Sequence, residues 1–288
     1  MLTLAELRKK AVEDPNVNVI ISDSGIEQFR RPAQTRRNLV HSVAKSVTAI
    51  GFGFAMQEGY VSLQESLADA FAQELPKVKE RFADHFGSEA AEAQLERLKE
   101  IKLSHLLSHT SGFRDNILTG FERPYLKEDD WTVLSLSVPV IHAPGEVFFY
   151  ADENFYLLAK LVQRRTKQNL SAYLLPRLFS PIGLRWPTWE ADPDGDAIGC
   201  GGLLLSLDEL HILGLLCQNS GSWSGETVVE EAWMRTVTTE KVPFGDGCGY
   251  GYGFWTAPDC YYMFGLGGVY SFIAKEGGLL ISADGLSL

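Results

Sequence analysis

The segment that decides the fold reads Asn38-Leu-Val-His-Ser42-Val-Ala-Lys45-Ser-Val-Thr-Ala-Ile50. It predicts a helix from about Ser42 to Glu58, ended by Gly59. Apolar residues occur nearly all round this helix, which is typical of a buried central helix. Ser42 and Lys45 share one helix face because they are three residues apart. A lysine is far rarer on a buried helix than on a surface, so the pair is a candidate for chemistry.

Ser42 and Lys45 together fit the roles of a nucleophile and its activator. A serine hydroxyl is a poor nucleophile until a nearby base takes its proton. A lysine amine can take it when burial or a neighbouring cation lowers the lysine pKa. The spacing alone also arises by chance because both residues are common. The alternative is an ordinary serine at a helix start beside a solvated lysine.

Composition places the chain among ordinary globular proteins. It has 288 residues, of which 45% are hydrophobic and 22% are charged. Its net charge of −11 argues against nucleic-acid and anionic-membrane partners. Charges interrupt the first fourteen residues, so they predict an amphipathic helix and no signal peptide. No stretch is apolar enough to span a bilayer. The four cysteines lack Cys-x-x-Cys spacing, so we expect free thiols and a cytoplasmic protein.

The order of elements predicts an α/β (α+β) fold, an antiparallel sheet flanked by helices with an inserted all-helical region. Strands are expected near both ends of the chain, at 17–22, at 26–30 and in a meander over 249–282, whereas 32–40 reads as a loop. Between them, 77–102 reads as an exposed helix and 155–165 as another. The predicted division is a sheet region of residues 1–60 and 196–288 and a helical region of residues 61–195, with the active site at their junction.

Several downstream segments follow Ser42 and Lys45 in the order of one known family. The segments are His109-Thr110-Ser111-Gly112, Pro144-Gly145-Glu146-Val-Phe-Phe-Tyr150-Ala-Asp152, Ile198-Gly-Cys-Gly201-Gly202-Leu-Leu-Leu-Ser-Leu-Asp208, and Asn219-Ser-Gly-Ser-Trp-Ser-Gly-Glu-Thr. With them, the chain resembles the serine β-lactamase-like superfamily, in its class C-type branch, from about residue 17 to residue 282. That branch contains class C β-lactamases, D-alanyl-D-alanine peptidases, esterases and amide hydrolases.

The resemblance implies roles for individual residues. Ser42 matches the acylated nucleophile of the Ser-x-x-Lys motif, and Lys45 matches its activating partner. Tyr150 matches the tyrosine of the Tyr-x-Asn motif, whose phenol acts as general base or proton shuttle. Which of Lys45 and Tyr150 takes the proton first stays open. The backbone amides of Ser42 and Leu266 would form the oxyanion hole.

Two departures from the family pattern bear on the substrate. Asp152 stands where asparagine is usual, and it would either pair with Lys45 or point to solvent. The third motif, normally Lys-Thr-Gly or His-x-Gly, is Met263-Phe264-Gly265, followed by Leu266-Gly267-Gly268. It lacks the cation that would bind a substrate carboxylate. Asp152, Gly265 and Gly267 are the expected substrate-binding residues.

The leading hypothesis is therefore a serine hydrolase that acts through an acyl-enzyme on small esters or amides. A β-lactamase or D-Ala-D-Ala peptidase, and a catalytically lapsed binding module, are the alternatives. Acyl transfer to an alcohol or amine is not distinguished from hydrolysis. We expect no metal and no cofactor, and we interpret His109 as a hydrogen-bonded core residue and 249–255 as a strand lining the site. A homodimer is a further hypothesis, because no helix is expected after the last strand.

Overall fold

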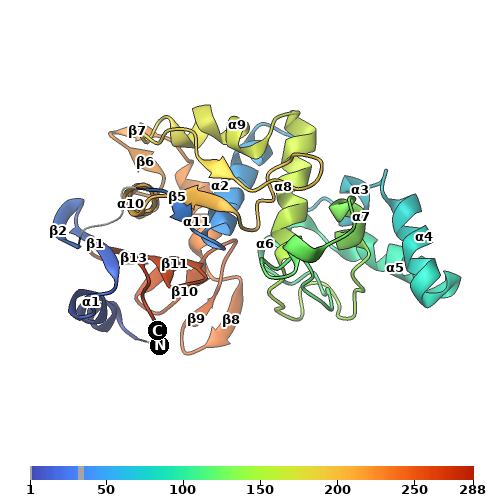
Figure 1. Ribbon diagram of the computed structural model, residues 1–288, viewed down its shortest axis with the longest axis horizontal. Coiled ribbons are helices and arrows are strands. Elements are labelled where there is room, and N and C mark those ends of the chain that lie inside the picture. Colours follow the sequence, from blue (N-terminus) through green and yellow to red (C-terminus); the bar gives the residue numbers. More distant parts are fainter. Residues whose placement is uncertain (1, 32–35) are drawn as a thin grey trace. The chain divides into compact units, whose positions relative to one another are not determined.

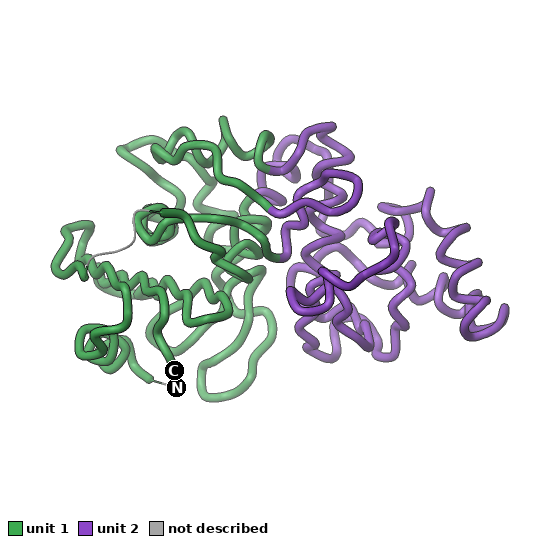
Figure 2. The backbone as a smooth tube through the Cα atoms, viewed as in Figure 1, with its two compact units in different colours: residues 1–50, 171–189, 201–288 green, residues 51–170, 190–200 purple. Residues whose placement is uncertain are grey.

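The chain forms two units, which Figure 2 distinguishes by colour. The computed structural model describes residues 2–31 and 36–288, so residues 32–35 of the predicted loop lie outside the described residues. Unit 1 consists of residues 1–50, 171–189 and 201–288. Unit 2 consists of residues 51–170 and 190–200.

Unit 1 is built on an eight-stranded sheet in the order β2-β1-β13-β12-β11-β10-β9-β8 (Figure 1). All neighbouring strands are antiparallel, which confirms the predicted sheet. The first strand pairs with the last, with Asn18 opposite Asp284. The strands are β1 (Asn18–Asp23), β2 (Ile26–Arg31), β8 (Val242–Gly245), β9 (Cys248–Tyr250), β10 (Trp255–Thr256), β11 (Cys260–Gly265), β12 (Val269–Ala274) and β13 (Leu279–Asp284).

Helix α1 (Leu4–Glu13) covers one face of this sheet. Because side chains alternate along a strand, Val19 and Ile21 of β1 face the same way, and they join Leu4 and Leu7 of α1 in one buried core cluster. Thr3 caps the start of α1 in a capping box with Glu6. The Arg31 guanidinium on β2 donates hydrogen bonds to the carbonyls of Ala11, Val12, Asp14 and Val17. These bonds supply partners for carbonyl groups at the C-terminal end of α1, which have none within the helix.

Helix α10 (Leu207–Gln218) packs on the opposite face, against β13, β12 and β1. Contact is close at Gly214, where a Cβ would lie 2.6 Å from Ser271 Oγ. Buried His211 bonds Ser22 and Ser282 on two neighbouring strands. Unit 1 also holds a three-stranded sheet of β3 (Asn38–Leu39), β5 (Leu203–Leu205) and β4 (Thr188–Trp189), the β6–β7 hairpin (Ser222–Trp223, Glu226–Thr227), η2 (Leu175–Phe179) and α11 (Glu231–Thr238).

Unit 2 is helical and is built around α8 (Asp152–Thr166), most of whose residues are buried. The chain enters unit 2 within α2 (Val43–Gln57) and leaves it within α9 (Leu170–Leu174). The remaining helices are α3 (Leu67–Ala70), α4 (Leu75–Phe86), α5 (Ser88–Glu100), α6 (Leu103–Leu107), the short η1 (Arg123–Tyr125) and α7 (Trp131–Leu136).

Several sequence predictions were wrong in detail. The expected loop over 32–40 contains the short strand β3. The expected helix over 77–102 is two helices, because Gly87 has a φ of +88°, which ends α4 before α5 begins. The expected single strand over 249–255 is the end of β9 and the start of β10, joined by a turn over 251–254 with Gly253 at a φ of +79°. Within the described ranges, no helix has both the length and the apolar character needed to cross a bilayer.

Candidate active site

Ser42 occupies the turn between β3 and α2. β3 pairs with β5, His41 follows with a φ of +48°, and α2 begins at Val43. Lys45 Nζ donates a hydrogen bond of 3.0 Å to Ser42 Oγ, and Lys45 is only 1% exposed. The structure therefore brings the predicted nucleophile and its predicted activator into direct contact at a helix N-terminus.

The glycine-rich turn between β9 and β10 packs against the backbone of Lys45. A Cβ on Gly253 would lie 2.9 Å from the Lys45 carbonyl oxygen, so only glycine fits at this contact. The Gly253 carbonyl in turn accepts a hydrogen bond from Ser46 Oγ. Trp233 of α11 donates from Nε1 to the Ala49 carbonyl at 3.1 Å. These contacts hold the first turns of α2 in place, and with them the Ser42–Lys45 pair.

The end of β11 lies against the residues that precede Ser42. A Cβ on Gly265 would be 2.2 Å from the Val40 carbonyl oxygen and 3.3 Å from His41 Cβ. Gly265 was predicted to be a substrate-binding residue, and the structure places the backbone of Val40 close to it. Leu266 is 52% exposed, and Gly267 and Gly268 turn the chain into β12 with φ of +80° and +82°.

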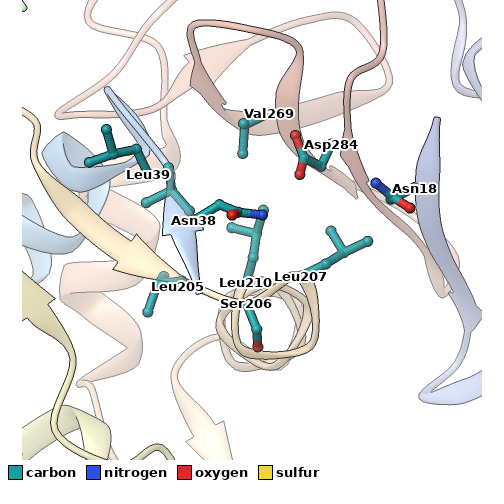
Figure 3. Close-up of a pocket in the computed structure, with 10 residues that line it drawn as sticks. Asn18, Asn38, Leu39, Leu205, Ser206, Leu207, Leu210, Val269 and Asp284 are labelled. Carbon is teal, nitrogen blue, oxygen red and sulfur yellow. The ribbon is translucent and has the colours of Figure 1, made fainter. Parts of the chain in front are cut away.

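Met263 is buried in unit 1, at the position that matches the basic residue of the third motif. It is 1% exposed and pairs across the sheet with Ser271. An apolar side chain in this place cannot bind a carboxylate. A small space in unit 1, lined by Asn38, Val269 and Asp284 (Figure 3), has a volume of about 10 Å³. That is room for one water molecule at most, and not for a substrate.

Tyr150 belongs to unit 2, where its ring contacts that of His109 with centroids 4.3 Å apart and the planes tilted by 34°. His109 Nδ1 accepts the Ala151 N–H at 3.3 Å and lies 3.0 Å from Asn154 Nδ2. His109 is fully buried, and its carbonyl accepts the Phe149 N–H at 2.8 Å. His109 is therefore a hydrogen-bonded core residue, as predicted, and it holds the segment that carries Tyr150.

Asp152 is the first residue of α8, and Asn116 Oδ1 accepts its N–H at 3.0 Å. Its carboxylate lies 4.0 Å from the guanidinium of Arg123. Arg123 also forms two hydrogen bonds to Glu190, of 3.1 and 3.0 Å, and donates to the Leu118 carbonyl at 2.7 Å. Of the two possibilities considered for Asp152, exposure to solvent is wrong, since its side chain is 13% exposed.

Glu153, the next residue, is fully buried. Its Oε1 accepts the N–H groups of Ile117 at 2.5 Å and Leu118 at 2.8 Å. Among the described residues, its Oε2 has no hydrogen-bond partner. Burial raises the pKa of this carboxyl to about 7, against the opposing effect of its backbone hydrogen bonds.

Lys160 of α8 is the centre of a buried ionic cluster in unit 2. Its Nζ lies 2.8 Å from Asp192, 2.8 Å from Asp194 and 2.7 Å from Asp196. Tyr156 donates its hydroxyl to Asp192 at 2.9 Å. The cluster ties residues 190–200 to α8. In the part of the chain that the structure describes, no group of three or more His, Cys, Asp or Glu side chains is arranged to hold a metal ion.

Comparison with known proteins identifies the family. The family model described as Beta-lactamase matches residues 24–282, which is most of the chain. The chain belongs to the beta-lactamase family. The match confirms the resemblance drawn from Ser42, Lys45 and Tyr150, and this beta-lactamase family member has the mixed α/β fold expected of it.

Relatives of this beta-lactamase family member include acyltransferases and hydrolases. Monacolin J acid methylbutanoyltransferase from Aspergillus terreus is 30% identical over 167 residues, which are 54% of this chain and 39% of that protein. The chain thus spans about two fifths of the length of this curated relative. The penicillin binding protein from Bacillus halodurans has a TM-score of 0.70 at 18% identity, covering 99% of this chain and 95% of its own. EstCE1, a hydrolase with promiscuous acyltransferase activity, has a TM-score of 0.70 at 15% identity, covering 97% and 91%.

The predicted site residues are divided between the units. Ser42, Lys45, Gly265, Leu266 and Gly267 belong to unit 1, and Tyr150 and Asp152 belong to unit 2. Sequence reasoning missed Arg123, Glu153 and Lys160, because their partners are distant in sequence and no local motif marks them. The aspartate at 152 was the one available signal, since a buried carboxylate calls for a nearby cation.

Proposed function

We propose that this protein is a serine hydrolase that forms an acyl-enzyme with small, uncharged esters or amides. The observation that carries the proposal is the 3.0 Å hydrogen bond between Lys45 Nζ and Ser42 Oγ, with Lys45 buried. Membership of a family with hydrolase and acyltransferase relatives supports it.

In the proposed reaction, Ser42 Oγ attacks the carbonyl carbon and forms a tetrahedral intermediate. The hydroxyl proton passes either to Lys45 as a neutral amine or to Tyr150 as a phenolate. The N–H groups of Ser42 and Leu266 stabilise the oxyanion, which needs only backbone donors. When the intermediate collapses, the alcohol or amine leaves with the proton that Lys45 or Tyr150 accepted. Water then attacks the acyl-enzyme. Gly265, Gly267 and Asp152 line the substrate.

Preference for an uncharged substrate follows from Met263. β-Lactams and D-Ala-D-Ala ends carry a carboxylate, and the third motif of this chain offers a buried thioether where a cation would bind it. Rapid nitrocefin hydrolysis would favour the alternative β-lactamase function. A catalytically lapsed binding module is the other alternative, and labelling of Ser42 by a fluorophosphonate would contradict it.

The test uses p-nitrophenyl acetate and butyrate with the wild-type protein, Ser42→Ala and Ser222→Ala. Ser222 is an exposed serine of the same unit and serves as the matched control. We expect turnover that Ser42→Ala abolishes and Ser222→Ala leaves intact. Turnover that survives Ser42→Ala unchanged would discard the proposal.

Acyl transfer is a second candidate function. A methylbutanoyltransferase is among the curated relatives, and EstCE1 is described as having promiscuous acyltransferase activity. The acyl-enzyme would then be attacked by an alcohol or amine in place of water. The ratio of transfer product to free acid, measured with increasing alcohol, distinguishes the two reactions.

We further propose a cytoplasmic location and association into homodimers. The four cysteines, Cys200, Cys217, Cys248 and Cys260, are free thiols, which suits a reducing compartment. A groove of about 570 Å³ in unit 1, lined by apolar side chains including Leu7, Phe244 and Tyr262, supports association. Cell fractionation tests the location, and gel filtration at monomer mass would contradict the dimer.

A further inference from the structure

A second pocket, the α4–α7 pocket, lies within unit 2 between α4, α7 and residues 115–117. Its volume is about 150 Å³, and an apolar space of that size holds one benzene ring. The apolar side chains that line it are Phe82, Phe86, Ile117, Leu134, Val138 and Pro139. The pocket therefore suits the apolar part of a small molecule.

Bonds within the protein fix the walls of the α4–α7 pocket. Phe82 and Phe86 are four residues apart on one face of α4, and their ring centroids are 4.7 Å apart. On the other side, the Arg114 N–H donates to the Pro139 carbonyl at 2.8 Å, which holds residues 115–117 beside the residues that follow α7. Walls formed in this way are typical of small-molecule sites.

Two side chains of opposite charge also line the α4–α7 pocket. Arg81 donates from Nη2 to Glu128 at 3.1 Å, and its Nε and Nη1 have no hydrogen-bond partner among the described residues. Asp115 accepts from Arg114 Nε through Oδ2 at 2.8 Å, and its Oδ1 has no partner in the same part of the chain. His85 is tied to α4, because its Nδ1 donates to the Arg81 carbonyl at 2.8 Å. Arg81 and Asp115 therefore both have hydrogen-bonding capacity left for a ligand.

The two charges border a space only as large as one small molecule, so a single ligand can reach both. A guanidinium binds a carboxylate through paired N–H donors, and a carboxylate accepts hydrogen bonds from an ammonium group. A ligand that complements Arg81 and Asp115 together carries both charges close to an apolar group. A free amino acid has this chemistry, because its carboxylate and ammonium are attached to the same carbon.

We propose that the α4–α7 pocket binds a free amino acid with an aromatic or large aliphatic side chain. The side chain lies among Phe82, Leu134 and Val138, the carboxylate binds Arg81, and the ammonium binds Asp115. This site goes beyond the proposed function and does not rest on it, because its test measures binding and not turnover. An absence of Ser42-dependent turnover would leave it unaffected.

The experiment measures the binding of L-phenylalanine to the full chain by ligand-observed NMR titration, beside two analogues that each lack one charged group. 3-Phenylpropanoate lacks the ammonium, and 2-phenylethylamine lacks the carboxylate. We expect each analogue to bind about tenfold more weakly, since each loses a charge-assisted hydrogen bond. Glycine, which lacks the side chain, should also bind more weakly than L-phenylalanine. An analogue that binds as tightly as L-phenylalanine, or no binding of L-phenylalanine, would overturn the inference.

Two variants locate the ligand in the α4–α7 pocket. Arg81→Met should weaken L-phenylalanine binding about tenfold without weakening 2-phenylethylamine binding, because that analogue has no carboxylate. Asp115→Asn should weaken L-phenylalanine binding without weakening 3-phenylpropanoate binding. It also covers a failure of Arg81→Met to fold, since Asp115 is 44% exposed. Arg235→Met is the matched control, because Arg235 forms an exposed ion pair with Glu231 in unit 1. Unchanged L-phenylalanine binding in Asp115→Asn, or equal losses for all three ligands, would overturn the inference.

Discussion

At the scale of single residues, the central question is which protonation state of the Lys45 side chain takes part in the reaction. Its Nζ donates a hydrogen bond to Ser42 Oγ. Only a neutral amine accepts a proton, so the reaction requires Lys45 to lose its charge or Tyr150 to act in its place. The two possibilities predict different behaviour for an arginine, which stays protonated in proteins.

Lys45→Met should lower kcat/KM for p-nitrophenyl esters by about 10²- to 10⁴-fold, since it removes the partner of the nucleophile. If Lys45 is the proton acceptor, Lys45→Arg should be as inactive as Lys45→Met. Steady-state kinetics and fluorophosphonate labelling measure both variants, with circular dichroism as the check on folding. Substantial activity in Lys45→Arg would instead assign proton transfer to Tyr150.

Glu153 should make stability depend on pH near neutrality. The folded state raises the pKa of Glu153 from its usual value to about 7, so the folded protein binds the extra proton. This group's contribution to stability is therefore greatest at acid pH and falls as pH rises from about 4.5 to about 7, by about 3 kcal/mol. Glu153→Gln should remove that loss, because glutamine keeps an Oε1 acceptor for Ile117 and Leu118.

Urea unfolding at pH 5 and pH 8 measures this effect. The stability difference between Glu153→Gln and wild type should grow in favour of the variant as pH rises. Glu100→Gln, at an exposed position of α5, is the control and should show no such trend. Equal pH slopes for wild type and Glu153→Gln would contradict the prediction.

At the scale of elements, the contact between β11 and the nucleophile segment is the one most easily tested. Gly265→Ala would place a Cβ 2.2 Å from the Val40 carbonyl, so one of the two backbones must move. We expect a loss of about 1–3 kcal/mol in stability and a lower kcat, because Val40 and His41 lead directly into Ser42. Gly120→Ala is the control, since its Cβ would make only an ordinary contact of 3.7 Å. Unchanged kcat in Gly265→Ala would show that Ser42 is held independently of β11.

The Lys160 cluster connects another pair of elements, α8 and the segment 190–200. Burial alone would lower the pKa of Lys160, and the three aspartates raise it overall. Lys160→Met leaves the buried Asp192 carboxylate without its cation, so the protein should lose about 3–5 kcal/mol of stability. Adding Asp192→Asn should restore part of the loss, whereas Lys127→Met, at an exposed position, should change little. Thermal unfolding compares the four proteins, and no recovery in the double variant would contradict the charge argument.

Element boundaries show how far sequence alone could go. The strands at 17–22 and 26–30 and the α2 helix were predictable, because their apolar patterns have a clear period. The break at Gly87 was missed because the surrounding Ala, Glu, Lys and Arg residues favour helix on both sides. Helix α8 begins three residues earlier than expected, since Asp152, Glu153 and Asn154 are polar but buried by specific hydrogen bonds.

Some residues of the candidate site could be predicted from the sequence and others could not. Ser42 and Lys45 could be paired from sequence because a helix turn places them together. Arg123 could not be found, since its contacts with Asp152 and Glu190 span 29 and 67 residues. Glu153 was missed for a similar reason, because its partners Ile117 and Leu118 precede it by more than thirty residues. Tertiary contacts of this kind leave no periodic signal in the chain.

At the scale of the whole molecule, each unit is assembled from separate stretches of chain. Unit 1 draws on three stretches and unit 2 on two. The residues proposed for catalysis follow this division. Ser42 and Lys45 precede the point at which the chain first passes from unit 1 to unit 2, and Tyr150 follows it. Neither unit can therefore be expressed as one uninterrupted piece, and tests of function require the full chain.

The pairing of β1 with β13 has a consequence for synthesis. The strand that hydrogen-bonds to β1, over residues 279–284, leaves the ribosome long after β1 does. Until then β1 can pair only with β2, and its other edge is open to strands of neighbouring nascent chains. Holdase chaperones that shield this edge during translation should therefore govern the yield of active protein.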